Sequence, residues 1–425
     1  MKAEILCVGT EILLGDIVNT NAAYLARELA AIGVPVYHQS VVGDNPGRLE
    51  AQLRDSFGRS DLVILTGGLG PTYDDLTKET AARYFGRNMV MDESSLRSIE
   101  AFFKKTGREM TDNNRKQALI PEGAVVFQNH CGTAPGLALE AGGRTAILLP
   151  GPPREMQMMY ETGVRPYLER LSGQVFLSRT IHIFGMGESA VEQKLRPVIS
   201  KMENPTAAPY AKTGEVQLRV TARASTSAEA ARLADPAVRQ LSEALGGVVY
   251  GVDVGSLQKA AVQALRERGL TAATAESCTG GLVSKRITEV PGASEVFGCG
   301  VCSYANGIKE KLLGVPHAVL AARGAVSEET AAAMAEGAAR LAGADIGVST
   351  TGIAGPGGGT AQKPVGLVYV GVWSRWHREV LRLELARGQA EEREQIRYLA
   401  SSHALHALWR TALMYQKERV DETVF

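Results

Sequence analysis

The sequence is poor in cysteine, has no excess of charge of either sign and contains no long apolar run. The five cysteines among its 425 residues are an odd number, which argues against a disulfide framework and fits an intracellular chain. Lysine and arginine together number 46, as do aspartate and glutamate, whereas a broad nucleic-acid surface requires clustered positive charge. We therefore do not expect nucleic acid to be a partner.

The chain also lacks the signals of membrane insertion or export. No apolar segment approaches the roughly 20 residues that a membrane-spanning helix needs. The N-terminus, MKAEILCVGTEILLGD, carries acidic residues within its apolar stretch and lacks the basic segment of a signal peptide. We expect a soluble, cytoplasmic protein without membrane partners. With 45% hydrophobic residues, the chain has enough apolar material for two or three cores.

Cys299 and Cys302 form a C-x-x-C pattern, which in other settings marks a redox or zinc site. They fall in VFGCGVCSY, which we expect to be a strand, and positions three apart on a strand point to opposite faces. No second C-x-x-C is present to complete a zinc site. We interpret both cysteines as small, buried apolar side chains.

The first part of the chain alternates apolar strands with helices, the pattern of a mostly parallel sheet covered on both faces. Strands are expected over residues 3–8, 34–42, 61–66 and 146–149, and an amphipathic helix over 19–32. The glycine- and proline-rich loops TGGLGPTYDD and PGPP follow two of these strands. Such sheets bind ligands beyond the carboxyl ends of their strands, where both loops lie.

A smaller unit starts near residue 174, and regular strand–helix alternation resumes at residue 256. The predicted fold class is therefore α/β: two α/β domains of three layers with mostly parallel sheets, joined by a small α+β domain. The expected elements are strands over 175–184 and 215–224 and helices over 189–200 and 228–245 in the smaller unit, then strands over 271–275, 346–350, 365–372 and 380–385 and helices over 257–268, 328–341 and 391–414.

The segment ESCTGG lies where an apolar strand meets the start of a helix. A serine there, Ser277, is exposed at the sheet edge, and the helix amides that follow are expected to stabilise an oxyanion or a phosphate. The alternative is that Ser277 or Thr279 only caps the helix. No histidine stands nearby to act as a base, so a nucleophilic serine here needs another one.

Lys309 in SYANGIK is a candidate base, because burial can lower the pKa of a lysine. The alternative is a solvated helix lysine like its neighbour Lys311. The glycine-rich loop 351–359 has many free amides, and it suits either a phosphate pocket or a hairpin connection.

In the first domain, TGGLGPTYDD combines glycines, which let a nucleotide approach the backbone, with two adjacent carboxylates. Asp74 and Asp75 can hold a divalent cation, which would assist hydrolysis of a pyrophosphate. Alternatively, either aspartate caps the next helix.

Six motifs occur in order along the chain: TGGLGPTYDDLT, LPGPPREM, AESCTGGLVS, SYANGIKEKLLGV, GAVSEET and TGIAGPGGGTAQKPVG. Together they resemble the CinA family over nearly the whole length. The resemblance implies a molybdopterin-binding-like domain over residues 1–170, which in this family hydrolyses ADP-ribose to AMP and ribose 5-phosphate with a divalent metal. It further implies a KH-like linker domain over 174–250 and a nicotinamide mononucleotide deamidase domain over 251–425, which needs no cofactor.

In the deamidase domain, the resemblance assigns Ser277 as the nucleophile and Lys309 as the general base. Tyr304 is expected to orient the lysine or the substrate amide. The sequence YANGIK stands where YSNEAK is usual, so the tyrosine and the lysine are retained while their neighbours differ.

The pocket of this domain is expected to involve Thr279, Gly280, Thr351 and Gly352. Arg393 corresponds to a family arginine near the start of the last helix. Arg397 is the competing choice, because RGQAEEREQIR departs from the usual G-D-R pattern.

In the first domain, the resemblance carries roles to residues of the two loops and of the early Gly-Thr-Glu. Those expected to bind nucleotide are Gly67, Gly68, Gly70, Thr72, Asp74 and Glu155, and those expected to bind the metal are Asp75 and Glu11.

The resulting hypothesis is a bifunctional enzyme of pyridine-nucleotide recycling, whose partners are nicotinamide mononucleotide, ADP-ribose and a second copy of the chain. We expect residues 251–425 to fold and work independently and the KH-like unit to be a spacer or dimer contact. One alternative is a deamidase whose first domain binds nucleotide without hydrolysing it. Another is a non-enzymatic partner in DNA uptake or recombination, against which the balanced charge argues.

Overall fold

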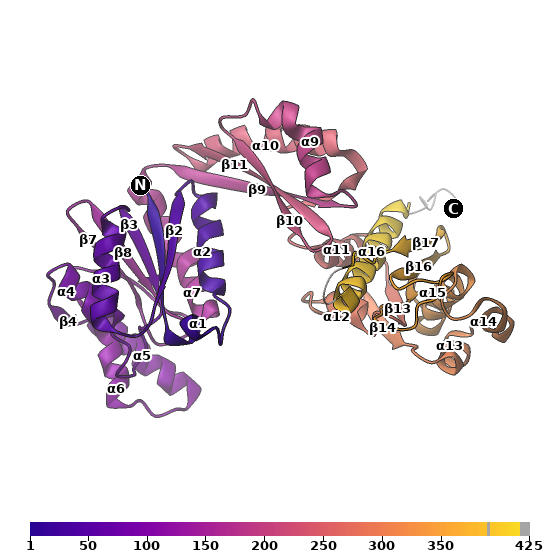
Figure 1. Ribbon diagram of the computed structural model, residues 1–425, viewed down its shortest axis with the longest axis horizontal. Coiled ribbons are helices and arrows are strands. Elements are labelled where there is room, and N and C mark those ends of the chain that lie inside the picture. Colours follow the sequence, from indigo (N-terminus) through magenta and orange to yellow (C-terminus); the bar gives the residue numbers. More distant parts are fainter. Residues whose placement is uncertain (389–391, 417–425) are drawn as a thin grey trace, which may run out of the picture. The chain divides into compact units, whose positions relative to one another are not determined.

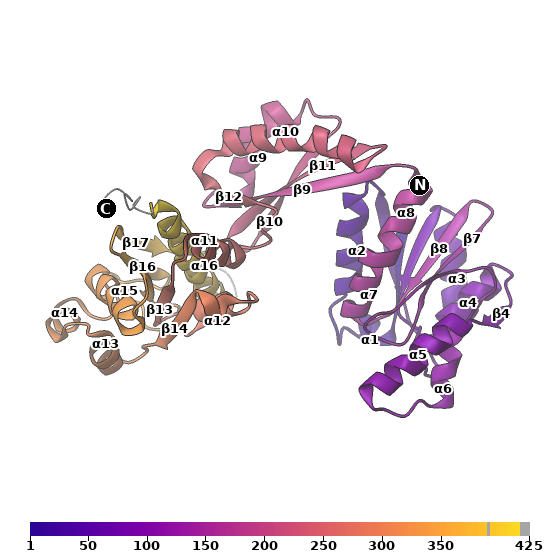
Figure 2. The same cartoon turned by 180° about the vertical axis from the view of Figure 1, so that it is seen from behind.

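A computed structural model describes residues 1–388 and 392–416 of the chain. Its internal contacts divide the chain into two compact units. The first comprises residues 1–178, 203–205 and 221–236, and the second comprises 179–202, 206–220 and the described residues from 237 onward. Within the described ranges, no helix is both long and apolar enough to cross a membrane. Figures 1 and 2 show the elements from opposite sides.

The N-terminal domain is built on a six-stranded sheet. Its elements are β1 (Ala3–Val8), α1 (Thr10–Leu14), α2 (Thr20–Ala31), β2 (Val36–Val42), α3 (Pro46–Phe57), β3 (Leu62–Thr66), α4 (Thr77–Tyr84), β4 (Met89–Met91), α5 (Glu93–Thr106), α6 (Asp112–Arg115), β5 (Leu119–Pro121), β6 (Val125–Phe127), β7 (Gly136–Ala141), β8 (Arg144–Leu149), α7 (Pro153–Met159) and α8 (Arg165–Ser172). The strand order is β2-β1-β3-β8-β7-β6. The first four strands in this order, β2, β1, β3 and β8, are parallel to one another. β7 and β6 extend the sheet with antiparallel pairings.

Alternate residues of the central strands enter two separate cores, one on each face of the sheet. Ile5 and Cys7 of β1 pack with α2, α7 and α8, whereas Leu6 and Val8 pack with α3 and α4. Because side chains alternate along a strand, a strand such as β1, which carries apolar residues on both faces, must be covered on both faces. The helices visible on either side of the sheet in Figure 1 provide this cover.

The middle domain is a four-stranded sheet in the order β10-β11-β9-β12. Its elements are β9 (Val175–Phe184), α9 (Glu188–Ile199), β10 (Thr206–Lys212), β11 (Glu215–Ala224), α10 (Ser227–Leu245) and β12 (Val249–Val252). The sequence predicted β9 and β11 with these bounds but missed β10 and β12. Both are edge strands, and Pro209 within β10 has no N–H to donate to a ladder.

The C-terminal domain has a five-stranded sheet in the order β14-β13-β15-β16-β17. Its elements are α11 (Leu257–Arg268), β13 (Ala272–Glu276), α12 (Leu282–Thr288), β14 (Phe297–Cys302), α13 (Asn306–Leu313), α14 (His317–Arg323), α15 (Glu328–Ala342), β15 (Ile346–Gly352), β16 (Leu367–Ser374), β17 (Arg378–Glu384) and α16 (Glu392–Met414). β13 pairs in parallel with β14 and β15, while β16 and β17 are antiparallel additions. The predicted α/β fold class is confirmed. The expectation of a mostly parallel sheet does not hold for this domain, whose sheet has two parallel and two antiparallel pairings.

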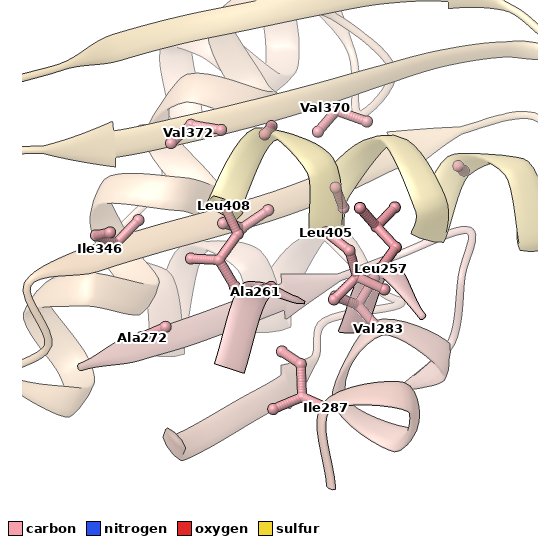
Figure 3. Packing of buried hydrophobic residues seen from close by; sticks show 14 of the residues in the cluster. Leu257, Ala261, Ala272, Val283, Ile287, Ile346, Val370, Val372, Leu405 and Leu408 are labelled. Atoms are coloured by element: carbon pink, nitrogen blue, oxygen red, sulfur yellow. The ribbon is translucent and has the colours of Figure 1, made fainter. Parts of the chain in front are cut away.

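α11 and α16 lie against each other on one face of this sheet and bury its largest core. Figure 3 shows Leu405 and Leu408 of α16 between Leu257 of α11 and the strand residues Ile346 and Val370. Truncating a leucine in such a core typically costs about 2–5 kcal/mol of stability. The core therefore fixes α16 relative to the strands whose ends carry the candidate site.

The interpretation of both C-x-x-C cysteines as buried is wrong for Cys302, which is exposed, and Cys299 is only half-buried. They alternate along β14 as expected of a strand. β14 is the edge strand of its sheet, so its side chains are less covered than those of the central strands. Neither cysteine is in a disulfide.

Candidate functional site

Ser277 immediately follows the wholly buried strand β13. Its amide donates to the carbonyl of Thr350 in β15 at 2.9 Å, and the amide of Ser303, just after β14, donates to the carbonyl of Glu276 at 2.8 Å. Because β13, β14 and β15 are parallel neighbours, their carboxyl ends meet at one edge of the sheet. This edge brings together the serine loop and the segment that leads to Lys309.

Lys309 is fully buried, although it lies on the short helix α13 beside the exposed Lys311. Its Nζ atom lies 3.3 Å from Oγ of Ser277 and donates to the carbonyls of Ser303 at 2.7 Å and Tyr304 at 3.1 Å. Burial lowers the pKa of Lys309, because desolvation disfavours its charged form. The alternative of a solvated helix lysine is therefore wrong.

Tyr304 contacts the lysine through its backbone, since its carbonyl accepts the hydrogen bond from Nζ. Tyr304 as a whole is 69% exposed. The carbonyl thus orients Lys309, and the exposed ring is left accessible to a ligand that occupies the site.

The start of α12 is held by the buried carboxylate of Glu276, not by a serine or threonine cap. Glu276 accepts hydrogen bonds from the amides of Val283 at 3.0 Å and Ser284 at 2.8 Å, and from the hydroxyls of Thr279 at 2.7 Å and Ser284 at 2.6 Å. The helix-cap alternative for Ser277 is wrong, because the N-cap position is Gly281, which makes no side-chain bond.

This arrangement also changes the expected oxyanion donors. The amides of Val283 and Ser284 are already bonded to Glu276, so the expectation that the first turn of this helix faces an oxyanion is wrong. In the described part of the chain, the amides of Cys278 and Thr279 make no backbone hydrogen bond and directly follow the serine. They are the better candidates.

Two predicted pocket residues have their hydroxyls engaged within the protein. Thr279 bonds to Glu276 and to Thr350, and Thr351 donates to the carbonyl of Ala325 at 2.7 Å. Both side chains are fully buried, so they shape the loops. The glycine-rich loop after Thr351 connects the antiparallel strands β15 and β16, which confirms the hairpin-connection alternative as a matter of topology.

Gly352 leaves no room for a side chain at this edge, whereas Gly280 is required by its backbone conformation and not by lack of space. A Cβ atom on Gly352 would lie 2.6 Å from Val368, whereas one on Gly280 would lie 3.4 Å from the guanidinium of Arg397. Gly280 also has φ of +60°, which disfavours other residues.

Arg393 and Arg397 contact different loops of the site. Arg397 donates to the carbonyl of Thr279 at 2.8 Å, and Arg393 donates to the carbonyl of Gly355 in the glycine-rich loop. The sequence left the choice between them open, and both lie at the site.

Cys278 directly follows the candidate nucleophile, but it is a poor substitute for it. Burial raises the pKa of its thiol to about 12, so the reactive thiolate is scarce near neutral pH.

In the N-terminal domain, a cavity of about 680 Å³ lies at the carboxyl ends of β1, β3 and β8. Of the residues that the structure describes, five carboxylates line it and no lysine or arginine does. All eight predicted residues of this domain belong to its lining: Glu11, Gly67, Gly68, Gly70, Thr72, Asp74, Asp75 and Glu155.

Gly67 shows why the loop is rich in glycine. It has φ of +105°, and a Cβ atom there would lie 2.0 Å from the carbonyl oxygen of Val8. Any side chain would push β1 away from the loop and deform the cavity.

The helix-cap alternative is wrong for Asp75. The N-cap of α4 is Leu76, without a side-chain bond, whereas Asp75 accepts hydrogen bonds from the amide of Thr72 at 2.9 Å and from its hydroxyl. Asp75 therefore closes the loop on itself at the cavity wall.

Sequence reasoning missed Asp44 and Asn21, which also line this cavity. Asp44 accepts from the amide of Thr10 at 2.9 Å, and Asn21 donates to Thr66 and to the carbonyl of Gly151. A usable signal was present for Asp44, because it follows β2 at the same end of the sheet as the two recognised loops.

The carboxylates that line this cavity do not by themselves form a complete site for a hard divalent cation. Among the described residues, no three His, Cys, Asp or Glu side chains gather into a preformed metal site. Magnesium is commonly held by one or two carboxylates together with substrate phosphates, so the cavity fits a cation that enters with its substrate.

A separate groove, of about 710 Å³, adjoins this cavity. Lys105, His130 and Arg154 line it, and no carboxylate does among the described residues. The two spaces share a wall, since Asn129 of the groove donates to Glu155 of the cavity at 2.6 Å. An acidic cavity thus adjoins a cationic groove.

Three family models match consecutive parts of the chain: a probable molybdopterin binding domain over residues 4–170, a damage-inducible protein CinA KH domain over 178–251 and a CinA C-terminal domain over 254–412. A CinA-like protein of Kosmotoga olearia is 50% identical over 413 residues, covering 97% of this chain and 99% of that protein. The chain belongs to the CinA family. A putative competence-damage inducible protein of Clostridium kluyveri is 48% identical over 414 residues, covering 97% of this chain and all of that protein.

Among solved structures, the protein CinA from Thermoplasma acidophilum is 38% identical and covers 39% of this chain and 96% of its own, with a TM-score of 0.36. In this chain, the geometry brings Ser277, Lys309 and Arg397 together at one sheet edge. It collects the eight predicted residues of the first domain around one cavity.

Proposed function

We propose that this CinA-family chain is a bifunctional hydrolase of pyridine-nucleotide recycling. Its C-terminal domain would hydrolyse nicotinamide mononucleotide to nicotinic acid mononucleotide and ammonia. The observation that carries this proposal is the fully buried Lys309 amine 3.3 Å from the Ser277 hydroxyl. Serine–lysine pairs are an established variant of the catalytic triad.

The contacts of Lys309 suit a neutral base. An uncharged amine has two N–H groups and one lone pair. The carbonyls of Ser303 and Tyr304 take the two N–H groups, which leaves the lone pair for the hydroxyl proton of Ser277. The lowered pKa of Lys309 increases the fraction of this neutral form.

The reaction then proceeds in two stages, acylation of Ser277 and hydrolysis of the acyl-enzyme. Ser277 Oγ attacks the carboxamide carbon while its proton moves to Lys309, and the amides of Cys278 and Thr279 stabilise the oxyanion. Lys309 returns the proton to the departing nitrogen, which leaves as ammonia with an acyl-enzyme behind. Water, deprotonated by Lys309, attacks the ester, and the serine recovers its proton as the nicotinate product leaves.

The N-terminal domain would hydrolyse the pyrophosphate bond of ADP-ribose with a divalent cation. Glu11 and Asp75 would hold the cation, which neutralises phosphate charge when bound. The acidic cavity alone would repel such a substrate. The adjoining groove, with Lys105 and Arg154, offers the opposite charge to the second half of the molecule.

The test uses the full chain and two substrates. Ammonia and nicotinic acid mononucleotide should appear from nicotinamide mononucleotide without added metal. AMP and ribose 5-phosphate should appear from ADP-ribose only with a divalent cation and not with a chelator. Absence of both ammonia release and ADP-ribose cleavage would favour a non-enzymatic role in DNA uptake or recombination. Ammonia release without ADP-ribose cleavage would leave the first domain as a nucleotide-binding module.

A further inference from the structure

A buried arginine joins three helices of the C-terminal domain behind the serine loop. Arg286 of α12 is 3% exposed, and its Nη1 donates to Ser401 and Ser402 of α16, both at 2.8 Å. Its Nη2 donates to Gln258 of α11 at 3.1 Å. The guanidinium also lies 4.6 Å from the ring centroid of Tyr398, again on α16. Arg286 thus sets the position of α12 relative to α16.

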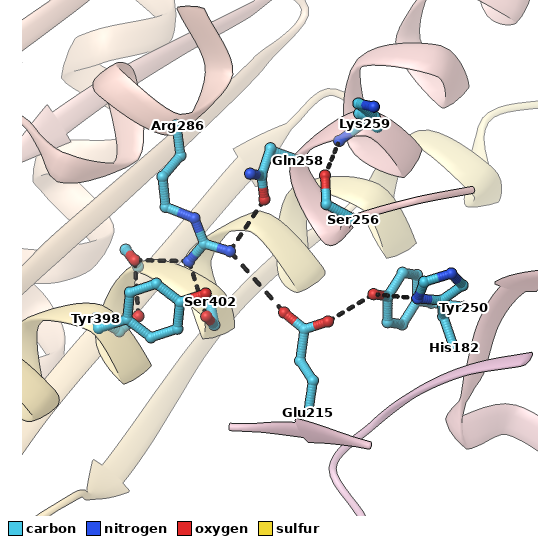
Figure 4. A network of polar contacts seen from close by, with 10 residues as sticks. His182, Glu215, Tyr250, Ser256, Gln258, Lys259, Arg286, Tyr398 and Ser402 are labelled. Carbon is cyan, nitrogen blue, oxygen red and sulfur yellow. Dashed lines mark hydrogen bonds and ion pairs between the residues drawn. The ribbon is translucent and has the colours of Figure 1, made fainter. Parts of the chain in front are cut away.

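The carboxylate facing this guanidinium comes from the KH domain. Glu215, the first residue of β11, places Oε1 3.9 Å from Nη2 of Arg286, and its side chain is only 10% exposed. Its other oxygen accepts from the hydroxyl of Tyr250 at 2.5 Å, and that hydroxyl lies 3.3 Å from Nδ1 of His182. Figure 4 shows this chain of contacts from Arg286 to His182.

The hairpin that carries Glu215 also packs directly on α16. Gly214, between β10 and β11, lies so close that a Cβ atom there would be 2.6 Å from Leu399. The backbone conformation at Gly214, with φ of +76°, likewise favours glycine. The hairpin tip therefore meets α16 one residue from Tyr398 and two from Arg397.

Two of the three helices joined by Arg286, α12 and α16, hold the serine loop. α12 begins directly after this loop, and α16 supplies Arg397, whose guanidinium bonds to the carbonyl of Thr279. A buried arginine without its carboxylate is an uncompensated charge, which the surrounding structure relieves by moving or by admitting water. Such movement would displace α12 and α16 together with the loop between Ser277 and Gly281.

We infer that Glu215 is a positioning residue for the serine site, so that the KH domain is a working part of the deamidase and not only a spacer. This inference rests on the proposed deamidase function for its kinetic readout. Glu215 acts through Arg286 on α16, and through Arg397 on the loop whose amides face the oxyanion. Its loss should therefore affect kcat more than KM.

The test compares Glu215→Gln with native full-length protein. The amide keeps the shape and the contact with Tyr250 but removes the charge. We expect kcat for nicotinamide mononucleotide, per folded molecule, to fall about tenfold, with KM within about twofold. The matched control is Glu192→Gln in the same domain, which breaks an exposed pair with Arg196 at 2.9 Å and should leave kcat unchanged.

A merely structural role would lower the melting temperature without changing kcat per folded molecule. A double variant also distinguishes a positioning role from a structural one. In an Arg397→Ala background, Glu215→Gln should cause little further loss of kcat. Multiplicative losses in the double variant, or a native kcat in Glu215→Gln, would overturn the inference.

Hydrogen exchange provides a readout that needs no substrate. Glu215→Gln should speed exchange of the amides in residues 277–288, whereas Glu192→Gln should not. If the native protein releases no ammonia, the deamidase proposal fails, and this comparison alone decides the role of Glu215. Native protection of residues 277–288 in Glu215→Gln would then refute it.

Discussion

The Nζ atom of Lys309 lies 3.3 Å from Oγ of Ser277, although 32 positions separate the two residues in the chain. Lys309→Met, which keeps an apolar stem, and Ser277→Ala should each lower deamidase kcat by about 10³-fold. The double variant should be little worse than either, because the pair acts as a unit. Ammonia release under saturating nicotinamide mononucleotide measures this.

The matched control for Lys309→Met is Lys311→Ala, two residues along the same helix and exposed. It should retain native kcat. Near-normal turnover in Ser277→Ala would remove the serine as nucleophile and direct attention to its neighbours in the loop.

The rate of deamidation should rise with pH through the apparent pKa of Lys309. Burial lowers this pKa, and the neutral amine is the reactive base, so the rate should reach its plateau below the usual lysine value of about 10.4. A kcat/KM profile for nicotinamide mononucleotide between pH 5 and 10 measures this. A rise that tracks an unperturbed lysine would contradict a buried base.

Asp75→Asn should abolish metal-dependent ADP-ribose cleavage, by about 10²-fold or more, and leave deamidation within about twofold. Asparagine retains an oxygen that can accept from Thr72, so the loop should persist while the charge is lost. AMP formation across a magnesium titration is the measurement. Asp55→Asn, an exposed change on α3, is the control, and unchanged cleavage in Asp75→Asn would exclude it as a metal ligand.

The cationic groove should bind the part of ADP-ribose that the acidic cavity does not. Combining Lys105→Ala with Arg154→Ala should raise KM about tenfold with little change in kcat, because these groups attract substrate without joining the chemistry. Lys104→Ala, on the same helix but outside the groove lining, is the control. A native KM in the double variant, measured at low salt, would show that the substrate does not extend into the groove.

A fragment of residues 251–425 tests whether the KH domain is only a spacer or a working part of the proposed deamidase. It retains Arg286 but lacks Glu215 and Tyr250. The sequence predicted independent activity, whereas the buried pair leads us to expect a kcat about tenfold below that of the full chain. Equal kcat values for fragment and full chain would restore the simpler prediction.

The sequence allowed prediction of the elements whose residues carry a strong periodic or apolar pattern. β1, β9, β11 and α11 were predicted with their observed bounds. β10 and β12 were missed because edge strands need few apolar residues and one contains proline. Their existence depends on pairing with strands distant in sequence, which local patterns do not encode.

For the candidate site, the motifs located Ser277 and Lys309, but not the partners that give them their environment. The burial of Lys309 and the role of Glu276 depend on side-chain directions at a sheet edge, which spacing along the chain does not specify. Glu215 was out of reach for the same reason, since its contact with Arg286 joins two domains of the chain. Asp44 was within reach, because strand order alone places it near the recognised loops.

The four hydrogen bonds to Glu276 determine when the serine loop becomes ordered. They close the serine loop into a ring that joins the end of β13 to the first turn of α12. The loop therefore loses its conformational entropy when the chain folds, and not when a substrate arrives. Under the proposed deamidase function, an incoming amide would meet a rigid template, and its binding energy would remain available for the transition state.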